Sequence, residues 1–441
     1  MVRAGFSVEH DRRNNRALPW RVAGAAVVLA GVVAQIARPL APDLGAVPDP
    51  ARWFDAHLLT RVAAYRGPLR VAGVVLLLID LVVPLSIACT GTGRRAIARM
   101  VATAGAHRPV RAATAVTLAI VLAIAALRLP LDLWAYRHAR VFGLSTQFPG
   151  AWLLDWGLAR ALELLTVGSL AVTGYALARR RPADWAAVAA PLGVAVLTTL
   201  ALVGPLLIEP LWFRITSLPD GPVRRQVTAV LEAAGNPQAP LLVADASRRS
   251  IRQNAYVSGL AGTRRVVLYD TLLERAPEEV ALVVAHELVH ARNHDLARGV
   301  AAGGAGWVIA CGVVAATLRL RVRTGRQQSV ADPHGAAAAF AVIVVLMVVA
   351  TPLGAWVSRR AEAAADLGAL QLTNRPGVYC AMQRGFVERN LTEPAPPDWQ
   401  RLWSATHPPP VSRLLMAETF TPGVDPVRAA GPALTATSAC G

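Results

Sequence analysis

The residues best suited to chemistry lie in the stretch His286-Glu287-Leu288-Val289-His290, which reads H-E-x-x-H. On an α-helix, residues four apart lie one turn apart on one face, so both imidazoles can reach a single metal ion. The carboxylate of Glu287 would then lie beside the open metal position, where it can accept a proton from an activated water molecule. The pattern predicts a site for one Zn²⁺ per chain that hydrolyses peptide bonds.

A helix is expected here because Pro277-Glu278-Glu279 precedes the apolar run that contains the motif. Proline at the first helical position and acidic residues in the first turn are typical of helix starts. His294 lies one further turn along and is an alternative third ligand. Three successive turns of a straight helix cannot all converge on one small ion, so we interpret His294 and Asp295 as supporting or membrane-edge polar residues.

The third ligand is expected from a second helix, in the segment 358–366. Glu362 and Asp366 are one helical turn apart, and Glu362 would complete a His₂Glu site that leaves the fourth position for water. Asp366 would accept the second N–H of a ligand histidine and fix its orientation. The alternative is a solvated acidic pair bonded to Arg359 and Arg360.

Other candidate residues flank these segments. Asn254 to Ser258 and 265–269, separated by the glycine-containing turn 261–263, predict a β-hairpin before the metal helix. An edge strand can hold an extended peptide, although every hairpin has an edge; the candidate substrate-binding residues are Asn254, Ala255 and Tyr256. In the C-terminal segment, His407 and Arg413 are donors able to stabilise an oxyanion, although a histidine beside prolines is more often structural.

The composition indicates a membrane protein, since 54% of the 441 residues are hydrophobic and 17% are charged. Seven apolar windows are long enough to cross a bilayer: 20–40, 69–91, 113–129, 152–178, 185–211, 298–318 and 335–357. The fold class is therefore mainly α, a polytopic membrane protein with about seven transmembrane helices and a small α+β zincin-like domain built from two segments. The expected divisions are 1–212 (membrane bundle, helices 1–5), 213–297 (first half of the metallopeptidase domain), 298–357 (helices 6–7) and 358–441 (second half and tail).

The formal charge of +17 comes from arginine alone, because the chain has no lysine. These arginines form no basic stripe with interleaved aromatic residues, so no nucleic-acid partner is expected. Seventeen of them precede the first window or follow the second, fourth and sixth, against eight in the opposite short loops. The positive-inside rule then places the protein in a plasma membrane with its N-terminus in the cytoplasm and the catalytic side extracytoplasmic.

The four cysteines are too few and too scattered for a disulfide framework or a cysteine-based zinc site. Cys89 and Cys311 are expected to be small packing residues at apolar windows. Cys380 and Cys440 share the tail, and they are able to pair if that tail is extracytoplasmic, but their spacing does not require it.

Over much of its length the sequence resembles the integral-membrane zinc endopeptidases of the type I CAAX prenyl protease family. The matching segments are Leu129 to Trp134 with Phe142-Gly143, Asp245 to Ser250, Asn254 to Tyr256, Val266 to Leu273, the H-E-x-x-H helix, Ser358 to Asp366, and His407 to Arg413.

The resemblance implies seven membrane helices around a water-filled chamber, with zinc bound by His286, His290 and Glu362 and with Glu287 as the general base. It further implies that Asp366 supports the site and that His407, Arg413 and the Asn254 strand contact the substrate or transition state. Val289 departs from the family, which usually has glycine there. Asn293 and Asp295 are more similar to bacterial heat-shock membrane proteases of the same superfamily, and eukaryotic CAAX enzymes are understood to act on the cytosolic side, opposite to the side that the arginine count indicates.

The sequence thus predicts a membrane-embedded zinc metalloendopeptidase acting on a peptide or protein substrate that is membrane-associated or unfolded. The alternative from another class is a non-catalytic membrane transporter or scaffold with a structural metal site. The two hypotheses differ in the expected effect of Glu287→Gln: the substitution should abolish cleavage by an enzyme and should have no effect on a transporter or scaffold.

Overall fold

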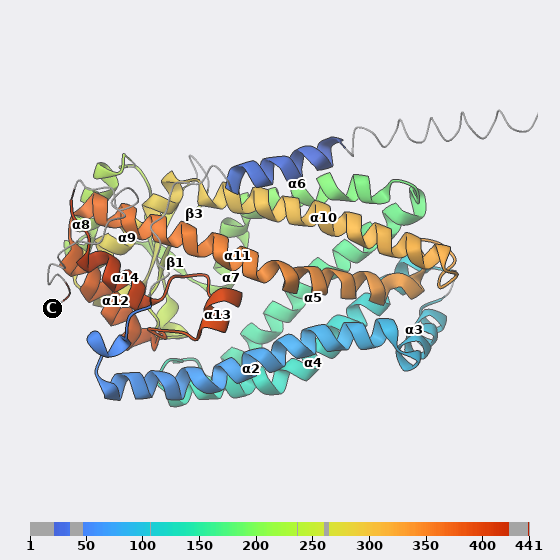
Figure 1. Ribbon diagram of the computed structural model, residues 1–441, viewed down its shortest axis with the longest axis horizontal. Coiled ribbons are helices and arrows are strands. Elements are labelled where there is room, and N and C mark those ends of the chain that lie inside the picture. The colour runs from blue at the N-terminus through green and yellow to red at the C-terminus, as the bar shows by residue number, and fades with distance from the viewer. Residues whose placement is uncertain are drawn as a thin grey trace, which may run out of the picture.

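The computed structural model describes residues 22–35, 47–105, 107–235, 237–259 and 264–422, together with Cys440. Long helices dominate it (Figure 1), and six helical segments of the described chain are long and apolar enough to cross a membrane: Ala56–Cys89, Pro109–Val141, Pro149–Arg180, Trp185–Trp212, Asp295–Arg323 and Pro333–Thr373. They coincide with six of the seven expected windows. The first window contains a shorter apolar helix, Val22–Gln35, and its remainder lies outside the described residues. The prediction of a mainly α, polytopic membrane protein is confirmed.

Two helices are much longer than a bilayer is thick. α2 (Ala56–Cys89) has 34 residues and α11 (Ala336–Thr373) has 38, which correspond to about 51 Å and 57 Å at 1.5 Å per residue, against about 30 Å of hydrocarbon. Both helices therefore extend beyond the membrane at one end. There the last turns of α11 run beside α9 (Pro277–Arg292) (Figure 1).

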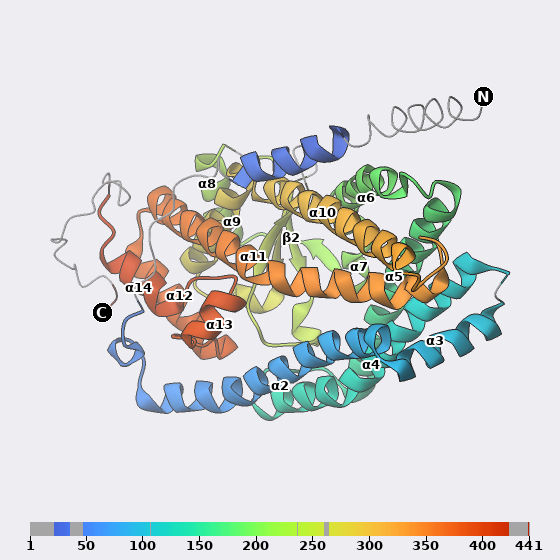
Figure 2. The ribbon, with the colours of Figure 1, turned by 45° about the vertical axis from the view of Figure 1, so that its right-hand side comes forward.

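The other bundle helices are α3 (Gly91–Ala104), α4 (Pro109–Val141), α5 (Pro149–Arg180), α6 (Trp185–Leu207), α7 (Glu209–Trp212) and α10 (Asp295–Arg323). α10 leads away from α9 to the far end of the molecule, and α11 leads back (Figure 2). The two segments that carry the predicted metal ligands therefore meet at one end of the bundle.

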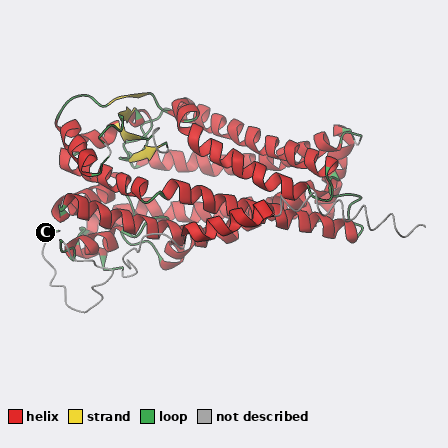
Figure 3. Cartoon of the chain, turned by 90° about the horizontal axis from the view of Figure 1, so that it is seen from above, coloured by secondary structure: helices red, strands yellow, loops and turns green. Residues whose placement is uncertain are grey.

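A four-stranded sheet lies at that same end (Figure 3). Its strands are β1 (Ile215–Ser217), β2 (Leu241–Ala244), β3 (Ala255–Ser258) and β4 (Arg265–Tyr269), in the spatial order β1-β2-β4-β3. β3 and β4 pair antiparallel, with Ala255 opposite Leu268, so the expected hairpin forms; its turn 261–263 lies outside the described residues. Because β3 is the last strand in the order, none of the described residues forms a strand beside its outer edge.

Short helices complete this end of the molecule: α8 (Pro222–Ala233), α12 (Pro376–Asn390), α13 (Asp398–Trp403) and α14 (Pro410–Glu418). One hydrophobic cluster joins α8, α12 and α14 to the sheet and to α9, and it also takes in Val62 and Tyr65 of α2 and the preceding residues Trp53 and Phe54. Apolar burial of this kind is the main stabilising contribution to folding. The start of α2 therefore packs against the same hydrophobic cluster as the sheet and α9.

Polar contacts fix the same junction. The guanidinium of Arg66 donates to the carbonyl of Leu391 at 2.6 Å, and Arg70 pairs with Glu393. Trp53 Nε1 donates to Glu418 at 2.8 Å. These contacts link α2 and the residue Trp53 before it to segments more than 300 residues away in the sequence.

Cys380 in α12 and Cys440 form a disulfide across 60 residues of sequence. Both residues are buried, and Arg384 donates to the carbonyl of Cys440 at 3.0 Å and to the carbonyl of Trp53 at 3.1 Å. The pairing that the cysteine spacing left open is thus present, and it holds Cys440 against α12.

Candidate metal centre

The helix that carries H-E-x-x-H is built as its sequence indicates. α9 starts at Pro277, with Glu278 and Glu279 in its first turn, and most of its residues are buried. The chain leaves the helix at His294, whose φ of 55° is left-handed and which begins α10. His294 therefore does not continue the face that carries His286 and His290.

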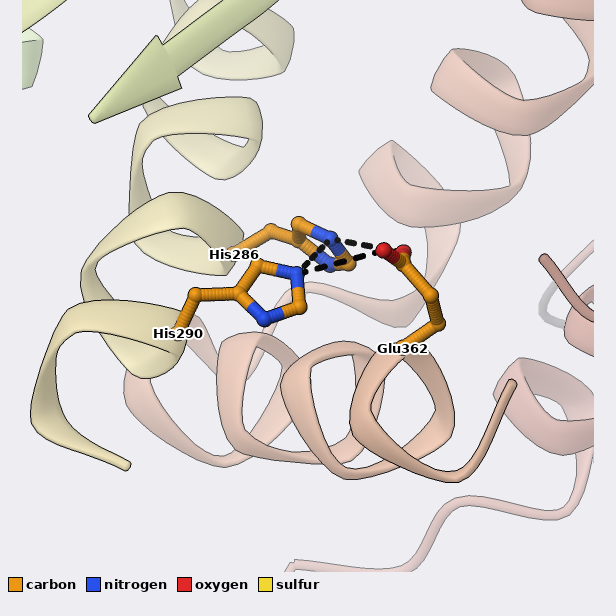
Figure 4. Close-up of side chains that lie close together, drawn as sticks. All are labelled: His286, His290 and Glu362. Atoms are coloured by element: carbon orange, nitrogen blue, oxygen red, sulfur yellow. Dashed lines mark hydrogen bonds and ion pairs between the residues drawn. The ribbon is translucent and has the colours of Figure 1, made fainter. Parts of the chain in front are cut away.

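His286, His290 and Glu362 converge from α9 and α11 (Figure 4). The two Nε2 atoms are 3.0 Å apart. The Glu362 carboxylate lies 3.3 Å from the Nε2 of His286 and 3.5 Å from the Nε2 of His290. Each residue offers one ligand atom, and these atoms all lie within 4.8 Å of one another. Among the described residues this is the one group of three or more such side chains that can hold a metal ion.

Each imidazole also has a carboxylate beside its second ring nitrogen. The Nδ1 atom of His286 lies 3.0 Å from the carboxylate of Asp366, and that of His290 lies 2.8 Å from Asp295. A carboxylate at the far nitrogen fixes the tautomer and orientation of a ligand histidine, so that the Nε2 lone pair faces the ion. Asp366 thus lies where the sequence placed it, and Asp295 has the corresponding place behind the second histidine.

Asp366 is fully buried and is paired with Arg413 of α14. Arg413 also donates from Nε to the hydroxyl of Tyr379 at 3.3 Å, and the amide oxygen of Gln383, oriented to accept, lies 3.2 Å from the same Nε. Tyr379 and Gln383 are buried on α12. Sequence reasoning missed both because an isolated tyrosine or glutamine in a helix has no local pattern that marks such a contact.

His407 lies on the open side of the site. Its Nε2 is 3.4 Å from the Glu362 carboxylate, and its side chain is 60% exposed. The side chain of Arg413 is only 12% exposed. Of the two donors expected near the oxyanion, only His407 is therefore accessible to a bound peptide.

The Glu287 carboxylate faces the edge strand. It accepts a hydrogen bond from the backbone N–H of Val257 in β3. Burial raises the pKa of Glu287, and Glu362 adds to this, while His286 and His290 lower it. The candidate base and the strand that contains Ala255 and Tyr256 are thus adjacent, and Asn254 directly precedes that strand.

The acidic residues of α11 are not a solvated pair bonded to neighbouring arginines. Arg359 donates to the carbonyls of Arg401 and Ala405 at 2.6 and 2.7 Å, and Arg360 lies over the ring of Trp356. The alternative reading of Glu362 and Asp366 is therefore wrong.

Val289, which departs from the family pattern, meets a glycine on the facing helix. A β-carbon built on Gly368 of α11 would lie 2.8 Å from both methyl groups of Val289. Real β-carbons do not approach other atoms so closely, so Gly368 provides the space that the valine occupies. This close contact lies between the two helices that carry the ligands.

We expect Gly368→Ala to separate α9 from α11 and to lower both thermal stability and metal affinity, with a cost of about 1–3 kcal/mol typical of overpacking. The double substitution Val289→Gly and Gly368→Ala should recover part of the loss, because removal of the valine methyl groups makes space for the alanine β-carbon. Gly354→Ala, on the same helix with open space around it, is the matched control. Unfolding curves and zinc titration measure both effects, and additive single effects would show that the two positions are independent.

Comparisons with known proteins find a family match for the segment that carries these residues. Residues 217–420 match the model of peptidase family M48. The chain is 24% identical over 299 residues to "Uncharacterized metalloprotease YhfN" of Bacillus subtilis, a match that covers 66% of this chain and 69% of that protein. Over 93 residues it is 41% identical to "CAAX prenyl protease 1 homolog" of Arabidopsis thaliana and 37% identical to "CAAX prenyl protease 1" of Saccharomyces cerevisiae. These last two matches span about a fifth of the length of each relative.

The fold is similar to the crystal structure of S. mikatae Ste24p, with a TM-score of 0.68 over 90% of this chain and 98% of that one, at 17% identity. The matched family segment contains all three converging ligands, Glu287 and the residues behind them. The chain is therefore a membrane metalloprotease whose segment 217–420 matches peptidase family M48 and which is similar to the CAAX prenyl proteases.

Proposed function

We propose that this protein is a zinc endopeptidase that cleaves membrane-associated or unfolded proteins at the surface of a plasma membrane. The observation that supports this most strongly is the convergence of two imidazoles from α9 and one carboxylate from α11, with Glu287 beside them. We further propose that 213–297 and 358–441 form one metallopeptidase unit around the membrane segment 298–357.

The spacing of the three ligands fits zinc. Ligand atoms bound tetrahedrally at about 2.0–2.1 Å lie about 3.3 Å apart. Here the two Nε2 atoms are 3.0 Å apart, Oε2 of Glu362 lies 3.3 Å from His286 Nε2, and Oε1 lies 3.5 Å from His290 Nε2. The Oε2 atom of Glu362 is buried, and it lies 3.3 Å from the Nε2 atom of His286. A cation bound between these two atoms would interact with a lone pair of each.

A zinc ion held here would supply a Lewis acid that lowers the pKa of a bound water molecule to about 7. Glu287 is placed to accept the proton of that water and to deliver it to the leaving amine. His407 is placed to donate a hydrogen bond to the developing oxyanion. Arg413 acts through Asp366, since its donors are already directed to Asp366 and Tyr379.

The substrate is proposed to bind as an added strand on β3. No strand within the described part of the chain lies beside the outer edge of β3, and Val257 of β3 contacts Glu287. A peptide paired with Asn254, Ala255 and Tyr256 would pass the candidate base in an extended form. Main-chain pairing of this kind accepts many sequences, which suits unfolded segments.

Removal of metal tests this function. A chelator should abolish cleavage of an unfolded reporter protein by the purified full-length protein. One equivalent of Zn²⁺ should restore cleavage, because the added ion would again supply the Lewis acid. Far-ultraviolet circular dichroism, measured in parallel, should not change. Cleavage that persists after metal analysis shows a metal-free protein would contradict the proposal.

Two observations support an extracytoplasmic active site. The first is the arginine distribution, which places the ends of the bundle opposite the metal centre in the cytoplasm. The second is the Cys380–Cys440 disulfide, because disulfides persist in oxidising compartments and are rare in the cytosol.

Thiol counting in native membranes tests the side of the membrane. In a Cys89→Ala, Cys311→Ala background, Cys380 and Cys440 are the remaining cysteines. Denatured, unreduced protein should bind no maleimide-polyethylene glycol, and reduced protein should bind two molecules, seen as gel shifts. Two free thiols without reduction would instead indicate a cytoplasmic active site while leaving the peptidase proposal intact.

A further inference from the structure

A cavity of about 620 Å³ lies where α4 begins and α5 ends. These helix ends are at the end of the bundle opposite α9 (Figure 2). The loop before α4, the first turns of α4 and the end of α5 line it. The metal site does not use it, and its lining chemistry differs from that of the peptidase site.

The polar part of the cavity is cationic. Arg108, Arg111 and Arg179 line it, and so does His107, which directly precedes Arg108. The three arginines are exposed, and no carboxylate of the described residues pairs with them; no aspartate or glutamate lines the cavity. Three uncompensated guanidinium groups around one hollow favour an anion, and guanidinium forks suit phosphate oxygens.

The start of α4 adds to this preference. Arg108 is the N-cap of the helix and gives its first turn no side-chain hydrogen bond, so backbone N–H groups remain available beside the partial positive charge of the helix end. Thr114, one turn further, also lines the cavity, and its buried hydroxyl oxygen has no hydrogen-bond partner in the described chain. A hydroxyl at this position can donate a hydrogen bond to an anion held by the arginines.

The deeper part of the cavity is apolar. Leu118 lies seven residues beyond Arg111 on α4, and Val172 lies seven residues before Arg179 on α5. At 1.5 Å per residue, both helices place an apolar side chain about 10 Å further into the membrane-spanning bundle than the cation. Val172 is 46% exposed on the outer surface of the bundle. The cavity therefore changes from cationic to apolar in the direction of the bilayer.

We propose that this cavity binds an anionic phospholipid, with the phosphate of its headgroup among Arg108, Arg111 and Arg179 and an acyl chain along Leu118 and Val172. A phospholipid has the same order of charge and hydrocarbon, and basic pockets between transmembrane helices on the cytoplasmic side bind anionic headgroups. A free phosphate ion would leave the apolar part of the cavity unfilled.

Native mass spectrometry of the full-length protein in detergent tests this site. Dioleoylphosphatidylglycerol should be retained and dioleoylphosphatidylcholine should not. Replacing all three arginines by glutamine should weaken phosphatidylglycerol binding about 100-fold, since each basic residue near a headgroup contributes a factor of about 5 in affinity and the three factors multiply. Val172→Trp, which fills the apolar part from an exposed position, should also reduce retention.

A matched triple variant, Arg94→Gln, Arg99→Gln, Arg323→Gln, removes the same charge from exposed positions that do not line the cavity. It should bind phosphatidylglycerol as the unmodified protein does, and both triple variants should keep the native circular dichroism spectrum. Equal losses in the two triple variants would show diffuse surface attraction and overturn the site. Displacement of the lipid by excess inorganic phosphate, or equal retention of phosphatidylcholine, would overturn a phospholipid as the occupant.

Discussion

Glu287→Gln is expected to abolish proteolysis while leaving the metal in place. Glutamine has nearly the same shape as glutamate but cannot accept a proton, and general-base catalysis contributes about 100- to 10,000-fold to rate. The ligand atoms of His286, His290 and Glu362 are unchanged by this substitution. The turnover number should therefore fall by about that factor, and zinc content should remain at one ion per chain.

Glu278→Gln is the matched control, since Glu278 lies in the first turn of the same helix, away from the converging ligands. Its cleavage rate should stay within about twofold of the unmodified protein, as is usual for surface substitutions away from special features. If Glu287→Gln retained cleavage at a similar level, the metal would be structural and the transporter or scaffold hypothesis would be favoured.

Arg413→Leu is expected to cause the largest loss of stability. The substitution leaves the carboxylate of Asp366 fully buried without its guanidinium partner, and breaking a buried pair in this way costs about 3–5 kcal/mol. Zinc affinity should also fall, by about 10- to 100-fold, because Asp366 orients His286. Denaturant unfolding and zinc titration of the purified protein measure the two effects separately.

A double-mutant cycle separates the pair from general packing. Asp366→Asn removes the buried charge, so Arg413→Leu should cost less in that background than alone. Arg389→Leu breaks the exposed pair with Glu274 and should cost no more than about 1 kcal/mol. An Arg413→Leu effect that is the same with Asp or Asn at position 366 would show that the guanidinium stabilises something else.

Local sequence patterns were sufficient for the elements whose signal is periodic or fixed in spacing. The apolar windows matched six long helices, since about 20 consecutive apolar residues leave few alternatives to a membrane-spanning helix. The α9 start at Pro277 and the β3–β4 pairing followed from helix-start and hairpin signals. The convergence of Glu362 with His286 and His290 followed from chemistry, because two histidines alone do not complete a metal site.

Contacts between distant segments could not be read from the sequence in the same way. Tyr379 and Gln383 reach Arg413 because α12 packs beside α14, and no periodic pattern specifies that neighbour. Val289 fits against Gly368 because α9 and α11 lie close together, and the identity of a single residue does not indicate the distance between two helices. The sequence allowed Cys380 and Cys440 to pair but did not require it, and the bond is seen only in the structure.

Zinc X-ray absorption spectroscopy of the purified full-length protein, with metal analysis of the same sample, tests the central claim most directly. The account predicts one zinc ion per chain, bound by two imidazole nitrogens and by carboxylate or water oxygens at about 2.0–2.1 Å, and it predicts loss of that ion in Glu362→Ala. A protein without stoichiometric metal, or an absorption spectrum that Glu362→Ala leaves unchanged, would contradict it.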